Sequence, residues 1–185
     1  MATVKPDLIT AEQYRIMPPP EDGSKVELVR GELETMCRPG FRHGLRQGRV
    51  YSILDNYGRS HGHGRAVVET GIVTEREPDT VRGPDVSYWS AARLPLDQEP
   101  DGYPDMAPDL AVEVLSPWNR LVLIRAKMGE YFDSGVRMVW VVDPEDRTVT
   151  VYRSLDQGQI LHESATLQVD DVLPGFACQV AELFA

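Results

Sequence analysis

Two segments in the second half of the chain are apolar at almost every position. They are Leu110–Leu115 and Met138–Val142. Continuous apolar runs of this kind are typical of strands that are buried on both faces of a sheet. Between them, apolar residues recur at helical spacing, which predicts a helix with Asn119 as its N-cap and Gly135 just past its end. Strand, helix and strand in this order predict a right-handed βαβ unit.

The first third of the chain predicts a short helix, a hairpin and a longer helix. A capping box opens the short helix, Thr10–Tyr14. The two residues Arg30–Gly31 separate Val26–Val29 from Glu32–Met36, which indicates a β-hairpin with a two-residue turn. Apolar residues at helical spacing then predict a helix from about His43 to Ser60.

The remaining segments alternate between β-type runs and loops. The β-type runs are Ala66–Thr74, Val86–Trp89 and Thr148–Tyr152. We expect a loop over Asp79–Gly83, and an irregular, exposed loop over residues 93–109, which are rich in Pro and Asp.

These elements predict an α/β fold in one domain. A chain of 185 residues suits a single core, so we expect one domain over residues 1–185. Residues 1–24 would form an N-terminal helix and loop. Residues 173–185 would form a C-terminal segment that docks through the apolar stretch Val180–Phe184.

Composition excludes several classes of protein. The net charge of −10 argues against a general nucleic-acid coat or a polybasic membrane anchor. No apolar run approaches the roughly 20 residues of a membrane span. The two cysteines have no metal-binding spacing and are too few for a disulfide framework. We therefore expect a cytoplasmic protein without a membrane partner.

Glu113 is the one charged residue in its apolar run, and it needs a cation, a proton or hydrogen-bond donors if that strand is buried. Asp85 follows Pro84 directly before the preceding predicted strand. Acids placed in this way can lie about one strand spacing apart, an all-oxygen arrangement that suits Mg²⁺ or Mn²⁺. Position alone equally allows Glu113 to form a structural ion pair with an arginine.

Two cationic features accompany these acids. Lys127 borders the apolar stripe of the helix after the Glu113 strand. Taken alone, this position indicates only a lysine whose side chain covers the edge of a helix. Residues 38–65 contain six arginines and one acid, Asp55. Such a local basic surface could meet a phosphate backbone, or it could be a solvated helix face balanced by neighbouring acids.

Taken together, these segments resemble a large bacterial family of restriction-endonuclease-like proteins in the PD-(D/E)XK nuclease superfamily, common in cyanobacteria and actinobacteria. The resemblance covers nearly the whole chain. It is carried by Val26–Leu33, His43 at a helix start, Thr80–Val86, Ala107–Pro117, Lys127 followed by Tyr131, Gly135–Pro144 and Leu173–Phe176.

The resemblance implies a restriction-endonuclease-like fold, with a central mixed β-sheet flanked by helices and an N-terminal β-hairpin. It also implies an endonuclease that uses Mg²⁺ or Mn²⁺ to hydrolyse phosphodiester bonds of DNA or RNA, and a homodimer. Asp85 and Glu113 would be the metal ligands, with the main-chain carbonyl of Val114 as a third. Lys127 would orient or activate the attacking water and offset charge on the phosphate.

Three further residues have possible roles by the same resemblance. Glu27 or Glu32 of the hairpin would complete or support the metal site, and His43 would contact phosphate.

Two departures from the family pattern leave the activity open. Leu123 stands where the family usually has an acid, and Trp118 and Asn119 stand where it usually has small polar residues. One alternative is therefore a catalytically impaired module of the same fold that binds nucleic acid or protein. The other is a metal-dependent hydrolase of a small phosphoester, which the acidic net charge would tolerate better.

Overall fold

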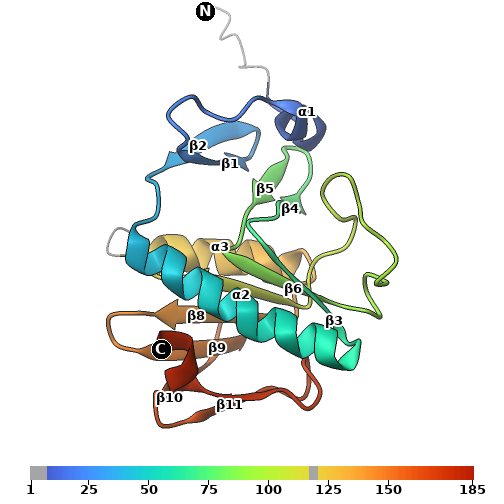
Figure 1. Ribbon diagram of the computed structural model, residues 1–185. Coiled ribbons are helices and arrows are strands. Elements are labelled where there is room, and N and C mark those ends of the chain that lie inside the picture. Colours follow the sequence, from blue (N-terminus) through green and yellow to red (C-terminus); the bar gives the residue numbers. More distant parts are fainter. Residues whose placement is uncertain (1–7, 117–120) are drawn as a thin grey trace, which may run out of the picture.

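A six-stranded mixed sheet forms the centre of the molecule (Figure 1). The computed structural model describes residues 8–116 and 121–185. In the order β10-β9-β8-β7-β6-β3, β7 and β8 are parallel and the other neighbours are antiparallel. These strands are β3 (Gly64–Val68), β6 (Val86–Ser90), β7 (Leu110–Val114), β8 (Met138–Asp143), β9 (Thr148–Ser154) and β10 (Gln157–His162).

A second, four-stranded antiparallel sheet lies above the central sheet in the view of Figure 1. Its order is β2-β1-β5-β4, and the short helix α1 (Ala11–Ile16) lies beside it. A two-stranded sheet and a 3₁₀ helix follow near the C-terminal end. The strands of these two smaller sheets are β1 (Lys25–Val29), β2 (Glu32–Met36), β4 (Ile72–Glu75), β5 (Thr80–Arg82), β11 (Thr166–Gln168) and β12 (Ala177–Gln179), and the 3₁₀ helix is η1 (Val180–Phe184).

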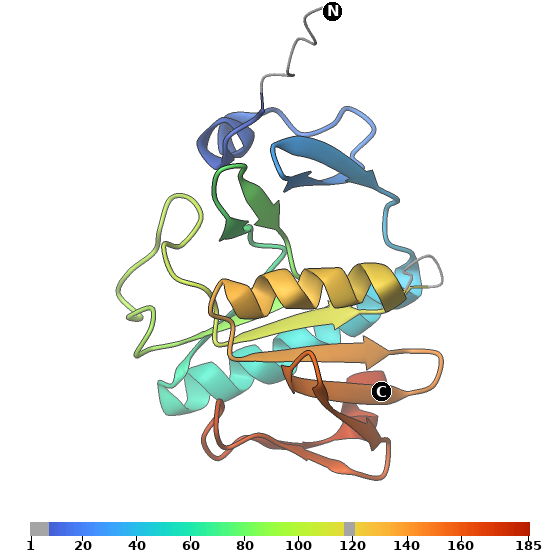
Figure 2. The ribbon, with the colours of Figure 1, turned by 180° about the vertical axis from the view of Figure 1, so that it is seen from behind.

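Two long helices cover opposite faces of the central sheet. Helix α2 (Phe41–His61) crosses its front in Figure 1, and α3 (Leu121–Asp133) lies in front when the molecule is seen from behind (Figure 2). Val112 and Val114 of β7 belong to the core cluster on the α2 side, whereas Ala111 packs in the cluster on the α3 side. Because strand side chains alternate, Glu113 points to the α3 side as well.

Local sequence signals explain several element boundaries. The predicted capping box of α1 is confirmed, with Thr10 and Gln13 bonded reciprocally. The hairpin turns at Arg30 and Gly31, both with positive φ, as a two-residue turn requires. Gly135, with φ of +100°, ends α3 and donates its N–H to the Phe132 carbonyl.

The predicted α/β fold and βαβ unit are confirmed, but two other predictions are wrong. The run 66–74 is not one strand, because the chain turns at Glu69, which has positive φ, and Ile72 begins β4 in the other sheet. The expected loop 79–83 contains β5, which pairs with both β1 and β4. Strands β10, β11 and β12 were not predicted, and Trp118 and Asn119 lie outside the described residues. Among the described residues, no helix is both long and apolar enough to cross a membrane.

Candidate active site

Two carboxylates meet at the junction of β6 and β7. Val86 pairs with Val112 in antiparallel register, so Asp85, one residue earlier, comes opposite Glu113, one residue later. Both acids are buried, each with 4 % of its surface exposed. The N–H of Val114 donates to Asp85 Oδ2 over 2.7 Å. The structure thus brings together Asp85, Glu113 and Val114, the three residues that the family resemblance implied as metal ligands.

Asp85 is surrounded by donors and cations. Its Oδ1 lies 3.1 Å from His43 Nε2 and 3.7 Å from Lys25 Nζ. Burial by itself would raise the pKa of Asp85, but the hydrogen bond from His43, the charge of Lys25 and the Val114 N–H together lower it. The pKa of His43 is raised in return, because Asp85 outweighs the effect of its burial. Asp85 is therefore ionised at neutral pH.

Glu113 has the opposite environment. Its one hydrogen bond from the described residues comes from the Tyr131 hydroxyl, 2.6 Å from Oε1. Burial, together with repulsion by Asp85, raises the pKa of Glu113 despite the nearby charges of Lys127 and Lys25. No arginine forms an ion pair with Glu113 within the described part of the chain. The described residues therefore show no structural ion pair between Glu113 and an arginine.

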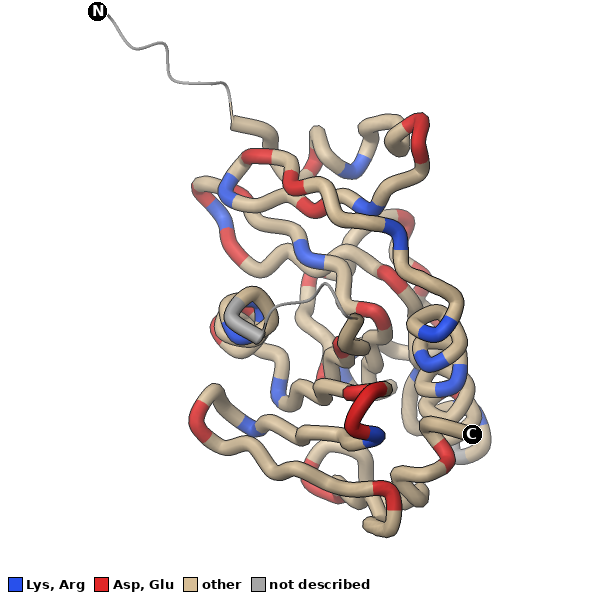
Figure 3. Tube along the Cα trace, turned by 90° about the vertical axis from the view of Figure 1, so that its left-hand side faces the viewer, with Lys and Arg blue, Asp and Glu red and all other residues tan. Residues whose placement is uncertain are grey.

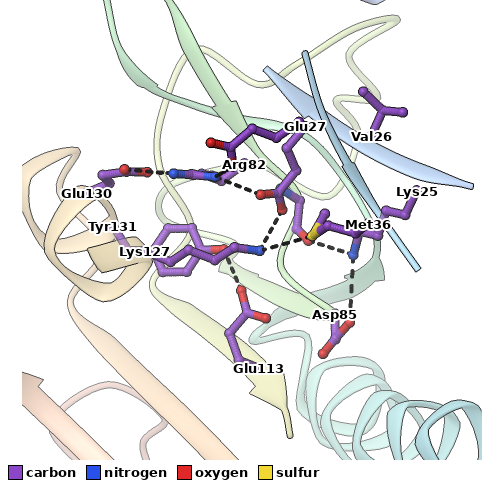
Figure 4. Close-up of polar contacts among 12 residues, drawn as sticks. Lys25, Val26, Glu27, Met36, Arg82, Asp85, Glu113, Lys127, Glu130 and Tyr131 are labelled. Atoms are coloured by element: carbon purple, nitrogen blue, oxygen red, sulfur yellow. Dashed lines mark hydrogen bonds and ion pairs between the residues drawn. The ribbon is translucent and has the colours of Figure 1, made fainter. Parts of the chain in front are cut away.

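Lys127 is held beside the two acids by Glu27 of the four-stranded sheet (Figure 4). Its Nζ lies 2.8 Å from Glu27 Oε1. Burial would lower the pKa of Lys127, but the charges of Glu113 and Glu27 raise it above the usual value. Lys127 is therefore a cation at neutral pH and a poor proton acceptor.

The Glu27 carboxylate forms ion pairs with two cations, Lys127 and Arg82. Its Oε2 accepts from Arg82 Nη1 over 2.9 Å, while its Oε1 also accepts the Gly83 N–H over 3.2 Å. Although burial opposes its ionisation, Lys127 and Arg82 hold the pKa of Glu27 below the usual range. Arg82 in turn forms a two-bond pair with Glu130 of α3, at 2.5 and 2.9 Å. These ion pairs connect β1 and β5 to α3.

Not every residue suggested by the sequence lies in this cluster. Glu32 is exposed, and its side chain makes no hydrogen bond or ion pair with the described residues. Leu123, at the position where an acid was expected, is 60 % exposed, one helical turn before Lys127. Glu27 lies with Lys127 and Arg82 rather than with Asp85 and Glu113.

Lys25, Arg82 and Tyr131 are site residues that the sequence analysis did not assign. Two of them had a usable signal. Lys25 and Glu27 alternate on β1 and so share one face, and Tyr131 follows Lys127 by one helical turn. Arg82 had no such signal, because its partners lie on β1 and α3, far away in sequence.

Comparisons with known proteins agree with this architecture. A crystal structure of a "putative nuclease belonging to DUF820" from Anabaena variabilis ATCC 29413 superposes with a TM-score of 0.78, at 23 % identity over 95 % of this chain and 97 % of that chain. A comparison with curated proteins gives no match. The model of the Uma2 family, described as "Putative restriction endonuclease", matches residues 11–181. The chain therefore belongs to the Uma2 family of putative restriction endonucleases, as its resemblance to restriction-endonuclease-like proteins predicted.

Proposed function

We propose that this protein is an endonuclease that hydrolyses phosphodiester bonds of DNA or RNA with the help of Mg²⁺ or Mn²⁺. The observation that supports this proposal is the pair of buried carboxylates, Asp85 and Glu113, with the cationic Lys127 beside them. Membership of a family of putative restriction endonucleases supports this reaction class, and the cluster offers the groups that such a reaction needs.

The donor set fits a hard divalent ion. Asp85 and Glu113 would supply oxygen ligands, and Val114, whose carbonyl is the third candidate, follows Glu113 directly. Glu113 Oε2 accepts no hydrogen bond from the described residues. The described residues contain no group of three or more His, Cys, Asp or Glu suited to a metal. Mg²⁺ commonly uses one or two carboxylates and completes its shell with water and substrate oxygens, so two acids are enough.

When bound, a divalent ion would supply Lewis-acid stabilisation of the phosphate and lower the pKa of a coordinated water. The protein's own groups then have distinct tasks. Lys127 stays protonated, so it balances negative charge on the reacting phosphate and orients water rather than accepting a proton. Glu27 positions the Lys127 ammonium, and the Tyr131 hydroxyl fixes the rotamer of Glu113.

A cleavage assay with Lys127→Met tests this proposal. Supercoiled DNA and a single-stranded RNA would be incubated with the wild type and the variant in Mg²⁺, Mn²⁺ or EDTA. We expect cleavage by the wild type with either metal and a loss of roughly 100-fold or more in the variant, because a positioned cation acts on the reacting phosphate. Manganese binding, followed as a rise in melting temperature, should persist in the variant.

Arg125→Gln is the matched control for Lys127→Met. Arg125 lies on the same helix, is exposed and, among the described residues, pairs only with Asp156 at the surface, so its loss should leave cleavage unchanged. Equal cleavage by the wild type and Lys127→Met would refute the assigned role of Lys127. A wild type that neither cleaves nor is stabilised by manganese would refute the proposed function and favour a binding module of the same fold.

A further inference from the structure

The first half of α2 carries arginines along one side. Arg42, Arg46 and Arg49 follow at spacings of four and three residues, so they share a helix face, and the first turn of α2 contains no acidic residue. Figure 3 shows these basic segments along the start of α2, on the side of the molecule where the helix begins. The other arginines between residues 38 and 65 have protein partners, namely Asp22 for Arg38, Asp55 for Arg59 and Pro95 for Arg65.

Among the described residues, no Asp or Glu side chain forms an ion pair with Arg42, Arg46 or Arg49 of this arginine face. The Arg42 side chain is exposed and makes no hydrogen bond or ion pair with the described residues, while Arg46 and Arg49 both donate to the main-chain oxygen of Ala185, 3.2 Å from each. Burial lowers the pKa of Arg46, and so do the positive charges of Arg147, Arg42 and Arg49. The cluster therefore repels itself, and a bound polyanion would relieve that repulsion.

Arg147, in the turn between β8 and β9, extends the face beyond α2. Its guanidinium and that of Arg46 lie 5.3 and 6.0 Å from the centre of the Phe184 ring, so an aromatic ring helps to hold both side chains. Arg147 also pairs with Glu163, and the exposed Glu145 and Asp146 precede it in the turn. These acids limit the basic surface at this end and leave α2 as its main part.

The basic face adjoins the candidate active site. His43 lies between Arg42 and Arg46 in the sequence, and its ring contacts Asp85. Gln47, one turn later, donates to the Asp85 carbonyl over 2.9 Å. Because each residue advances a helix by about 100°, the arginine face of α2 lies beside the face that contacts Asp85.

We infer that Arg42, Arg46 and Arg49 of α2, extended by Arg147, bind the phosphodiester backbone of a nucleic acid and direct it to the site at Asp85 and Glu113. The inference rests on the proposed function for the identity of the polyanion. The three α2 positions span about 10 Å of helix, enough for several phosphates of a duplex that carries one charge per about 1.7 Å. A local cluster is needed here because the net charge of −10 repels nucleic acid from the rest of the surface.

Salt-dependent binding tests this inference without cleavage. Fluorescence anisotropy would measure binding of a labelled DNA duplex, and of an RNA duplex of the same sequence, in EDTA over a range of salt concentrations. The variant is Arg42→Gln with Arg49→Gln, which spares the partly buried Arg46. We expect its plot of log K against log salt to be shallower by about 2, and its affinity at about 0.1 M salt to fall roughly 60-fold, since each phosphate contact contributes a slope of about 0.9.

Arg59→Gln, on the same helix but paired with Asp55, is the control and should bind like the wild type. Circular dichroism would check that all variants are folded. Identical affinity and slope in the wild type and the double variant would overturn the inference, as would a wild type that binds neither duplex at low salt. Because EDTA prevents metal-dependent cleavage, reduced binding by the double variant supports the inference even if the wild type proves inactive as a nuclease.

Discussion

Glu113 lies on a strand whose five residues are all buried, and its surroundings do not neutralise it. Tyr131 supplies one hydrogen bond, Lys127 is engaged by Glu27, and Asp85 adds a second negative charge nearby. A carboxylate in such a place lowers stability when it ionises, because burial and like charge both oppose the ionised form. The presence of Glu113 at this position fits a role in binding a cation. A bound cation would stabilise the ionised carboxylate and offset both its burial and the repulsion by Asp85.

The substitution Glu113→Gln should therefore stabilise the metal-free protein at neutral and higher pH. The pKa of Glu113 is higher in the folded than in the unfolded protein. Its contribution to the free energy of unfolding is therefore fully present below the pKa of the unfolded state and is lost as pH rises through the pKa of the folded state. Urea unfolding in EDTA should show little difference near pH 4 and an advantage of about 1 kcal/mol for Glu113→Gln near pH 8. The variant should also lose the manganese-induced rise in melting temperature.

Glu145→Gln, at an exposed turn, removes one carboxylate without touching the cluster and serves as the control. If Glu113→Gln were instead less stable than the wild type by about 3–5 kcal/mol near pH 8, with a difference that shrinks at low pH, Glu113 would be part of a structural ion pair.

At the scale of elements, α2 packs closely against the central sheet at Gly58, whereas Gly48 is exposed to solvent. A Cβ at Gly58 would lie 2.4 Å from the main-chain oxygen of Gly64, at the start of β3, whereas a Cβ at Gly48 would meet nothing within 4 Å. Gly58 is therefore required by helix–sheet packing, and this packing positions the helix that carries His43 and the arginine face. At Gly48, no neighbouring atom requires a glycine.

Paired glycine substitutions on α2 test this packing. Gly58→Ala should destabilise the protein by about 1–3 kcal/mol, because backbone must move to admit the methyl group. Gly48→Ala should stabilise it by up to about 1 kcal/mol, because alanine has the higher helix propensity and the space is free. Urea denaturation midpoints measure both, and a stabilising Gly58→Ala would mean that α2 lies farther from β3 than the structure shows.

At the scale of the whole molecule, buried charges join the four-stranded sheet to the central unit. Arg82 of β5 and Glu27 of β1 connect to Glu130 and Lys127 of α3. The site is therefore assembled from both sheets, and the position of Lys127 depends on a strand about 100 residues earlier. Loss of this link should affect folding and catalysis together.

The substitution Glu27→Gln tests this link, because its effect on stability should depend on pH. The pKa of Glu27 is lowered in the folded protein, so its stabilisation is present above the unfolded value, 4.5, and is lost as pH falls through the folded value. At pH 7 the variant should be less stable than the wild type by about 3–5 kcal/mol, because two buried cations lose their shared partner. The difference should shrink steadily below about pH 4.5. A difference that does not change with pH would contradict the charge link; Glu32→Gln, on the exposed part of the same hairpin, is the control.

The sequence by itself determined the βαβ unit and much of the α3 side of the site. Apolar runs mark β7 and β8, alternation directs Glu113 to the face of Ala111, and helical spacing places Lys127 and Tyr131 on one side of α3. These are local periodicities, so they can be predicted without knowledge of distant contacts.

Only the tertiary structure decided which distant groups surround those residues. The short strand β5 is defined by its pairing with β1 and β4, and its own three residues, Thr80–Arg82, carry too little pattern to predict a strand. The partners of Arg82, Lys25 and Glu27 likewise come from other elements. The pKa values of Arg82 and Glu27 therefore depend on packing rather than on neighbours in sequence. Strand pairing across sheets and the burial of charges are long-range properties. For that reason Asp85, Glu113 and Lys127 could be predicted from the sequence, whereas Lys25 and Arg82 could not.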